Sequence, residues 1–335
     1  MSAMNPAPIN AELIVKEAEA TAAKLGEARA AIADVIFGQD VVVERALTTV
    51  LAGGHGLLVG VPGLAKTKLV DTMGTVFGLS DNRIQFTPDL MPSDILGSEI
   101  LDESVDHRRS FRFVRGPVFA QLLLADEINR ASPRTQSALL QSMQEHFVTI
   151  AGQRHDLPRP FHVLATQNPI ELEGTFPLPE AQLDRFLMQI DVLYPDVDAE
   201  RRMLFETTGA EESRARSVLN ADELMAAQQL VRRMPVGEAV VESILKLVRS
   251  LRPGEADPRV GEQIAWGPGP RASQALMLTV RARALLDGRF APSLDDVEAL
   301  AVATLQHRMA VTFAARASEG ITVRDLISNA LKAVL

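Results

Sequence analysis

The chain has 335 residues, enough for two or three domains, and its 47% hydrophobic and 23% charged residues are ordinary for a soluble globular protein. It contains no cysteine, no apolar run long enough to cross a bilayer and no signal-peptide core, which favours a cytoplasmic protein without membrane insertion. A net charge of -9 with one Trp and one Tyr argues against nucleic acid as the main partner, because such binders usually carry a basic surface and stacking aromatics.

Two helices are predicted at the start of the chain. Residues 11–36 are rich in Ala, Glu and Lys, and their apolar positions suit an amphipathic helix: Leu13, Ile14, Leu25, Ile32 and Val35. A second helix, over about residues 41–52, follows the segment Phe37-Gly38-Gln39-Asp40. We expect residues 1–36 to pack as part of the core that follows.

The next part of the chain alternates short apolar runs with helical segments. The runs lie at residues 57–59, 83–86, 122–125, 162–165 and 188–192. Short runs buried on both faces and separated by helices are typical of a parallel sheet in a three-layer α/β domain. We therefore predict an α/β nucleotide-binding core over residues 37–195.

Two segments interrupt this pattern and are predicted to be insertions. Residues 96–116 hold Phe111 and Phe113 in local alternation, and alternating phenylalanines more often pack a hairpin onto a core than contact a partner. Residues 146–159 predict a hairpin centred on Ala151-Gly152.

After Pro195 we expect no further strands. Four helical patterns follow at residues 221–234, 237–251, 271–286 and 293–309. Ser293 with Asp296, and Thr322 with Asp325, have the spacing of capping boxes and mark helix starts. Residues 196–335 are therefore predicted to form a linker and an all-α domain.

A phosphate-binding loop is predicted immediately after the first strand. Its residues are Gly60-Val61-Pro62-Gly63-Leu64-Ala65-Lys66-Thr67, and a helix beginning at Lys68 follows. Glycines let backbone N–H groups curl around phosphates, and the helix N-terminus adds positive potential. Lys66 is expected to neutralise the β- and γ-phosphates and Thr67 to bind Mg²⁺; the predicted nucleotide contacts are Gly60 and Pro62 to Lys68. Ala65 replaces the usual second glycine at a helix start, where a methyl group need not clash.

Two acids end the apolar run at 122–125. In open α/β sheets ligands bind at the carboxyl ends of the strands, so Asp126 is placed to join Thr67 in the Mg²⁺ shell and Glu127 to polarise the attacking water. An Asp-Glu pair by itself would more often cap a helix, here one starting near Ile128. The preceding apolar strand and the upstream loop favour the catalytic interpretation.

Asn168 ends another core strand, at residues 162–168. Its amide could hydrogen-bond the water and the γ-phosphate, whereas the alternative is that Thr166 and Asn168 only form a turn before Pro169. The adjacent motifs favour the first interpretation. No pair of histidines has metal-site helix spacing, so no separate metal centre is predicted.

Five strings in order resemble the AAA+ superfamily of ATPases and are closest to the MoxR family. The similarity covers nearly the whole chain, and the strings that carry it are Phe37-Gly38-Gln39-Asp40, Gly60 to Thr67, Ala125-Asp126-Glu127-Ile128-Asn129-Arg130-Ala131, Ala165-Thr166-Gln167-Asn168-Pro169, and Pro179-Glu180-Ala181-Gln182-Leu183-Asp184-Arg185-Phe186.

The resemblance implies roles for several further residues. Phe37 and Gly38 match the segment beside adenine, Asn168 the sensor-1 residue, and Arg185 the arginine finger that reaches a neighbouring subunit. Arg271, in Gly269-Pro270-Arg271, matches the sensor-2 arginine of the helical lid, with Gly269 replacing the usual serine. Residues 96–116 resemble the helix-2 insert and 146–159 the pre-sensor hairpin. Without the family, either arginine could equally be an ordinary surface arginine, with Asp184 or Glu180 as the ion-pair partner of Arg185.

The function implied is Mg²⁺-dependent ATP hydrolysis by a ring, a hexamer, that remodels or matures a protein partner. Because the chain ends with the lid, we expect a separate client or adaptor, of the kind that carries a von Willebrand factor A domain. The alternatives are a nucleic-acid motor or loader, a motor subunit like that of magnesium chelatase, and a nucleotide-regulated scaffold with little turnover. The acidic charge argues against the first, and intact Lys66, Asp126 and Glu127 against the last.

Overall fold

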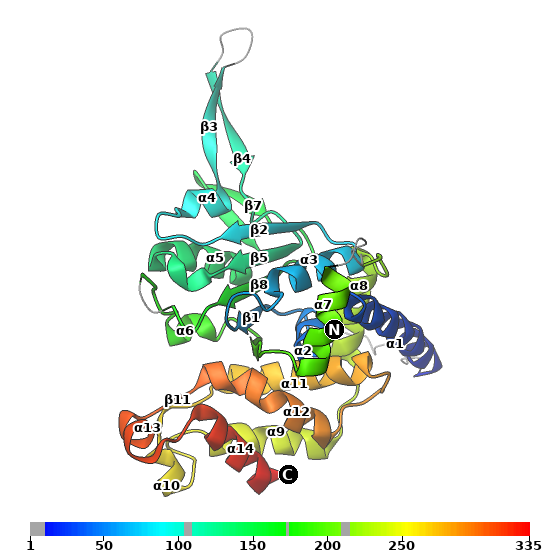
Figure 1. Ribbon diagram of the computed structural model, residues 1–335, viewed down its shortest axis with the longest axis vertical. Coiled ribbons are helices and arrows are strands. Elements are labelled where there is room, and N and C mark those ends of the chain that lie inside the picture. Colours follow the sequence, from blue (N-terminus) through cyan, green and yellow to red (C-terminus); the bar gives the residue numbers. More distant parts are fainter. Residues whose placement is uncertain (1–10, 104–108, 172–173, 209–214) are drawn as a thin grey trace, which may run out of the picture.

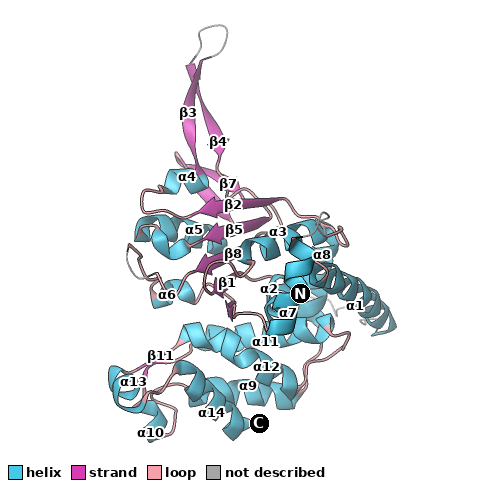
Figure 2. Ribbon diagram, in the orientation of Figure 1, coloured by secondary structure: helices cyan, strands magenta, loops and turns pink. Residues whose placement is uncertain are grey.

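The computed structural model describes residues 11–103, 109–171, 174–208 and 215–335, and its centre is a five-stranded parallel sheet (Figures 1 and 2). In spatial order the strands are β2 (Asp81–Gln85), β5 (Leu122–Asp126), β8 (His162–Gln167), β1 (Gly56–Val59) and β9 (Met188–Asp191). All four neighbouring pairs are parallel. Each predicted apolar run is one of these strands, so the predicted parallel sheet is confirmed.

Both faces of the sheet are covered by helices. Successive side chains of a strand point to opposite faces, so neighbouring residues of one strand belong to different apolar clusters. Leu122 and Leu124 belong to one apolar cluster, which includes residues of α1 (Ala11–Ala33), α2 (Asp40–Leu51) and α3 (Lys66–Val76). Leu123 and Ala125 belong to the other, with α4 (Pro92–Leu96) and α5 (Pro133–Glu145). The three-layer α/β architecture is therefore confirmed.

A helix starting near Ile128 is not observed. Residues Ile128–Arg130 form one 3-10 turn, η1, and α5 begins only at Pro133, where Ser132 caps it. Proline is favoured in the first helical turn because its missing N–H has no partner there in any case. The two acids after β5 therefore do not cap an α-helix.

Two hairpins extend from the core. β3 (Gly97–Glu103) pairs antiparallel with β4 (Arg109–Arg115) and projects from the body (Figure 1), while β6 (Phe147–Ile150) pairs with β7 (Gln153–Asp156) around Ala151 and Gly152. The packing prediction is right for Phe113, whose ring stacks on His155 at 4.0 Å, but wrong for Phe111, which is 71% exposed. Phe111 lies opposite Leu101, itself exposed, on a part of the hairpin with no core beneath it.

The C-terminal part is mainly helical. The predicted helices are α8 (Ala221–Arg233), α9 (Glu238–Ser250), α11 (Pro270–Leu286), α12 (Leu294–Leu305) and α14 (Val323–Val334), with both predicted capping boxes formed. The sequence patterns do not predict α6 (Glu180–Leu183), α7 (Val197–Thr207), α10 (Pro258–Gly261) or α13 (Phe313–Glu319). The helix predicted over 293–309 is α-helical only to Leu305 and ends in the 3-10 turn η2 (Gln306–Arg308). Among the described residues, no helix is long and apolar enough to cross a bilayer.

The expectation of no strands after Pro195 is wrong. β10 (Ile264–Trp266) pairs antiparallel with β11 (Ala310–Val311). Strands of three and two residues are too short to show an alternating pattern, so they could not be predicted from the sequence.

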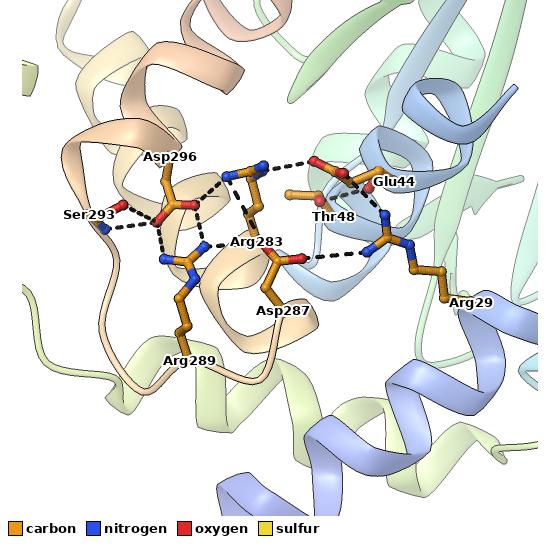
Figure 3. A network of polar contacts seen from close by, with 8 residues as sticks. All are labelled: Arg29, Glu44, Thr48, Arg283, Asp287, Arg289, Ser293 and Asp296. Atoms are coloured by element: carbon orange, nitrogen blue, oxygen red, sulfur yellow. Dashed lines mark hydrogen bonds and ion pairs between the residues drawn. The ribbon is translucent and has the colours of Figure 1, made fainter.

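An ionic network ties the C-terminal helices to the core (Figure 3). Arg283 of α11 pairs with Glu44 of α2 at 2.8 Å and with Asp296 of α12 at 2.7 Å, and Arg289 also pairs with Asp296 at 2.6 Å. Burial raises the pKa of Asp296, but hydrogen bonds from Arg289, from the Ser293 N–H and from Arg283 outweigh it and hold the pKa below its usual value. Asp296 therefore remains ionised and joins the two arginines.

Two buried histidines begin adjacent strands at the edge of the sheet opposite the carboxyl ends. His55 Nδ1 accepts from the Val163 N–H at 2.9 Å, so its Nε2 donates to the Met143 carbonyl at 3.2 Å. His162 Nδ1 lies 2.9 Å from the Gly54 carbonyl and its Nε2 lies 2.9 Å from the Gln228 amide nitrogen. Each ring thus has one well-defined neutral tautomer. Burial lowers the pKa of His55 to about 3 and that of His162 to about 4.

We expect the free energy of unfolding to fall between pH 6.5 and pH 4. The unfolded chain binds protons near the ordinary histidine pKa, whereas the folded chain does not, so stability is complete above pH 6.5 and is lost as the pH falls. His162 alone should contribute about 3 kcal/mol to that loss. Urea unfolding at several pH values measures it. In a His162→Asn variant, whose amide can still donate to Gly54, the pH dependence should be shallower by that amount; equal slopes would contradict the prediction.

Candidate functional site

A cavity of about 400 Å³ lies at the carboxyl ends of β1, β5 and β8. The parallel register places Val59 beside Gln167 and Leu124 beside Leu164, so the segments that follow these three strands meet at one edge. The residues lining the cavity are Pro62, Gly63, Ala65, Lys66, Thr67, Lys68, Asp126, Glu127 and Asn168. The structure thus gathers nearly all of the predicted phosphate, metal and water residues.

The loop before α3 adopts the backbone that phosphate contact requires. Gly63 has φ +84°, and Ala65, which precedes α3, lies in the left-handed region at φ 56° and ψ 22°. The prediction that an alanine is tolerated here rested only on the space around the Ala65 methyl group. The observed conformation costs an alanine roughly 1–2 kcal/mol relative to a right-handed one, a strain that a glycine at this position would avoid.

Two of the predicted loop contacts, Gly60 and Leu64, do not line this cavity. A Cβ atom at Gly60 would lie 2.6 Å from the Val192 carbonyl oxygen, so glycine is needed for packing against the end of β9. Its own carbonyl accepts a hydrogen bond from Lys66 Nζ. Burial lowers the pKa of Lys66, and the charges of Asp126 and Glu127 oppose that shift. Lys66 is therefore a partly desolvated cation beside two acids.

The Thr166 hydroxyl orients the two acids, a role that the sequence analysis did not assign. It donates to Asp126 Oδ1 at 2.5 Å and accepts from the Glu127 N–H at 2.8 Å. Asp126 Oδ2 is paired with Arg83 of β2 at 2.6 Å. The parallel register of β5 with β8 ends at Ala125 and Ala165, so the next residues, Asp126 and Thr166, lie side by side; the sequence patterns do not predict that these two strands are neighbours.

Glu127 lies in the left-handed region, at φ 55° and ψ 48°, which turns its side chain back toward neighbouring strand ends. Its Oε2 accepts from the Gln85 amide at 2.7 Å and from Arg130 at 2.9 Å. Within the described residues no hydrogen bond uses Oε1. A strained, doubly fixed carboxylate with one free oxygen is suited to bind and orient a water molecule.

The turn predicted at Asn168 is present, and the same side chain lies at the cavity. Its Oδ1 accepts from the Ile170 N–H at 3.1 Å, which is the predicted turn, and its Nδ2 lies 3.4 Å from Glu171 Oε2. The side chain also lines the cavity and is almost fully buried. The turn fixes the amide that faces the cavity.

A second cavity of about 200 Å³ adjoins the first and shares Pro62, Gly63 and Ala65 with it. Phe37 and Leu64 line it, together with side chains that the sequence analysis did not single out: Gln39, Tyr194, Pro195, Glu200 and Met203. The Arg202 guanidinium lies 5.4 Å from the centre of the Phe37 ring. An apolar cavity with a few polar groups beside a phosphate loop has the composition of a base-binding site.

Gly38 shapes this second cavity without lining it. Its φ is +67°, and a Cβ atom would lie 2.4 Å from the Ala199 Cβ of α7 and 3.0 Å from the Pro195 Cβ. Only glycine therefore allows α7, which carries Glu200 and Met203, to approach the segment at Phe37.

Arg185 and Arg271 line neither cavity. Of the two alternative ion-pair partners of Arg185, Asp184 and Glu180, the first is already engaged, since Asp184 binds Arg308 at 2.9 Å and Arg271 at 3.5 Å. Within the described part of the chain, no hydrogen bond or ion pair uses the Arg185 side chain. The Arg271 side chain, at the start of α11, is 61% exposed. Both arginines thus lie outside the lining of the two cavities of their own subunit.

The chain itself offers little to hold a metal. In the described ranges no group of three His, Cys, Asp or Glu side chains could bind an ion. The Thr67 hydroxyl and the Asp126 carboxylate nevertheless line one cavity. Mg²⁺ commonly takes one or two carboxylates and completes its shell with substrate phosphates and water, so these two residues fit a metal that arrives with a nucleotide.

Known proteins match this arrangement. The profile of the ATPase family associated with various cellular activities (AAA) matches residues 55–188, and that of the AAA lid domain matches residues 256–330. Chaperone MoxR1 of Mycobacterium tuberculosis is 42% identical over 95% of this chain and 84% of that protein. The chain belongs to the MoxR family of AAA+ ATPases.

Further relatives agree with the assignment. Protein MoxR of Methylorubrum extorquens is 30% identical over 83% of this chain and 85% of its own length. The crystal structure of a putative ATPase from Cytophaga hutchinsonii has a TM-score of 0.87 and 36% identity, covering 96% of this chain and 97% of that one. This MoxR-family chain is therefore an ATPase with an αβα core and a helical lid.

The close contact at Gly38 makes a prediction for this ATPase. Gly38→Ala should lower stability by roughly 1–3 kcal/mol and weaken nucleotide binding, because the new methyl group forces α7 away from the second cavity. Gly26→Ala is the matched control: nothing lies within 4 Å of that position in α1, so helix propensity alone should raise stability by roughly 0.5–1 kcal/mol. Thermal unfolding and titration with a fluorescent ATP analogue measure both. Unchanged affinity in Gly38→Ala would contradict the role given to this contact.

Proposed function

We propose that this ATPase is a Mg²⁺-dependent ring oligomer, a hexamer, that remodels or matures a protein partner in the cytoplasm. The observation that carries the proposal is the 400 Å³ cavity, which gathers Lys66, Thr67, Asp126, Glu127 and Asn168 at one sheet edge. The chaperone-like role is supported by the similarity to Chaperone MoxR1.

In this proposal the two cavities hold one ATP molecule. The backbone of residues 62–65, with Lys66, Thr67 and Lys68, binds the phosphates. Phe37 and Leu64 border the adenine, in a pocket whose shape depends on Gly38. We divide the chain into residues 1–36 and 37–195, which build the core, and residues 196–335, which form the linker and lid.

Thr67 and Asp126 would hold Mg²⁺ in this site. The ion would neutralise charge on the β- and γ-phosphates while the phosphoryl group is transferred. The protein's part is to fix the carboxylate: Thr166 holds Oδ1 of Asp126, and Arg83 holds Oδ2.

Hydrolysis is assigned to Glu127 with Asn168. Glu127 Oε1 accepts a hydrogen bond from the attacking water and orients it, while Gln85 and Arg130 fix the other oxygen. The Asn168 amide contacts the water and the γ-phosphate. Lys66 supplies positive charge to the phosphates throughout.

The oligomeric form is inferred from what the single chain lacks. Arg185 and Arg271 line neither cavity, so we assign them to the ATP of a neighbouring subunit, Arg185 as the arginine finger. The helix α7, beside the second cavity, has no buried residue and exposes large apolar side chains: Val197 at 80%, Leu204 at 58% and Phe205 at 75%. An apolar helix face beside an incomplete site supports burial against a second copy.

The partner is proposed to be a protein client or adaptor, in keeping with the family resemblance one that carries a von Willebrand factor A domain. The net charge of -9 supports a protein over a nucleic acid. Phe111, exposed on the projecting β3–β4 hairpin, is a side chain available for such a contact.

The first experiment measures ATP turnover per subunit against protein concentration. If the site is completed by a neighbour, specific activity should rise with concentration and level off once rings have formed. A Phe205→Glu variant should shift this rise to higher concentration, because a charge replaces apolar surface at the interface. Specific activity that is independent of concentration, with a monomer in sedimentation, would exclude completion by a neighbour.

A further inference from the structure

Arg308 is a buried arginine of the lid for which the proposed ATP site has no direct use. It ends η2, directly after α12, and its side chain is only 4% exposed. Its Nε donates to Asp184 Oδ1 at 2.9 Å, its Nη2 to the Phe186 carbonyl at 2.6 Å and its Nη1 to the Leu187 carbonyl at 3.0 Å. Nη1 also donates to the Thr304 carbonyl within the lid. A buried guanidinium therefore joins the lid to residues 184–187 of the core.

The segment that Arg308 binds is the one that carries Arg185. Residues 184–187 lie between α6 and β9, outside any helix or strand. Arg308 binds on both sides of Arg185, and the neighbouring His307 Nε2 lies 2.9 Å from the same Phe186 carbonyl. Phe186 itself is fully buried. The backbone on each side of Arg185 is thus fixed by lid side chains, whereas the Arg185 side chain is not.

The geometry requires an arginine. The planar guanidinium offers five donors in a rigid fork, which lets one side chain reach a carboxylate and two carbonyls at once; a lysine ammonium cannot span them. Asp184 also lies 3.5 Å from Arg271 at the start of α11, so a second lid arginine contacts the same segment. The contacts of Asp184 with Arg308 and with Arg271 both change if the lid moves relative to the sheet.

We propose that Arg308 is a positioning residue that sets the backbone of residues 184–187, and through it Arg185, according to the position of the lid. The inference rests on the proposed function, in which Arg185 acts on a neighbour's ATP. The lid of each subunit then controls hydrolysis in the adjacent subunit, because the lid holds the segment that carries the arginine finger, Arg185.

The first test compares kcat and KM for Arg308→Lys and the parent. Arg308→Lys keeps the positive charge and loses the forked set of donors. We expect kcat to fall about 10- to 100-fold, because misplacing a catalytic group by about 1 Å has an effect of that size. KM should change less than about threefold. Arg289→Lys is the matched control: it weakens a lid arginine–aspartate pair that does not touch residues 184–187. Its kcat should stay near that of the parent. An equal fall of kcat in both variants would overturn the proposal.

The second test is a double-mutant cycle with Arg185→Ala. If Arg308 acts through Arg185, adding Arg308→Lys to Arg185→Ala should lower kcat no further. Multiplicative losses would overturn the inference while leaving the proposed function intact. A normal kcat in Arg185→Ala alone would instead refute the finger and, with it, the role of Arg308. Should Arg308→Lys fail to fold, Asp184→Asn removes the carboxylate of the same contact and must show the same cycle.

Discussion

Glu127→Gln should bind ATP as tightly as the parent and hydrolyse it about 10²- to 10⁴-fold more slowly. The amide has nearly the shape of the carboxylate, so the contacts to Gln85 and Arg130 can largely be kept. An uncharged amide, however, cannot accept a proton from the attacking water. Single-turnover hydrolysis and equilibrium titration with ATP separate the two effects.

The control for Glu127→Gln is Glu145→Gln, the same chemical change at an exposed position at the end of α5. It should leave both turnover and affinity unchanged. If Glu127→Gln hydrolyses ATP within a few-fold of the parent, another group orients the water. If its affinity for ATP falls as well, the carboxylate has a structural role in the binding site.

The fold could be predicted because the central strands β1, β5 and β8 are buried on both faces and so contain continuous apolar runs. Strand β5 is an example: Leu122 and Leu124 pack in one core cluster, and Leu123 and Ala125 in the other. Because both faces are buried, every one of these positions is apolar. The phosphate loop and the acids were also visible, because they follow directly on such runs. The sheet edge then placed them around one cavity.

The residues that orient the site were less visible, because their role depends on neighbouring strands rather than on nearby sequence. Thr166 contacts the acids across the β5–β8 pair, and Gln85 reaches Glu127 from β2, the strand on the other side. Neither belongs to a spacing pattern within its own strand. Only a strand order, which the sequence analysis did not predict, would have suggested them.

Prediction from the sequence is limited in the linker and lid for the same reason. The helix α7 was missed because it has no buried residue and therefore no apolar stripe facing a core. The hydrogen bonds of Arg308 to Asp184, Phe186 and Leu187 likewise leave no trace in the local sequence. Contacts between segments more than a hundred residues apart must be read from the structure.

Arg185→Ala should bind ATP normally and lose about 10²- to 10³-fold in turnover, because a guanidinium that stabilises the charge on the transferring phosphoryl group is removed. Lys66→Ala should instead lose ATP binding itself. The two variants thus disable opposite sides of one proposed interface. Arg185→Ala has an intact ATP site but no arginine finger, whereas Lys66→Ala has the finger but cannot bind ATP. Turnover of each variant and of their mixture is the measurement.

Mixing the two variants should restore activity that neither has alone. In a ring with head-to-tail contacts, a site is active when an Arg185→Ala subunit receives its finger from a Lys66→Ala neighbour. Random mixing in equal amounts therefore allows about one quarter of the parent activity per subunit. The control is an Arg185→Ala subunit mixed with one that carries both changes, which should stay inactive. If the first mixture is inactive although mixed rings form, Arg185 does not act across the interface. If it recovers, the free side chain of Arg185 belongs to the neighbour's ATP.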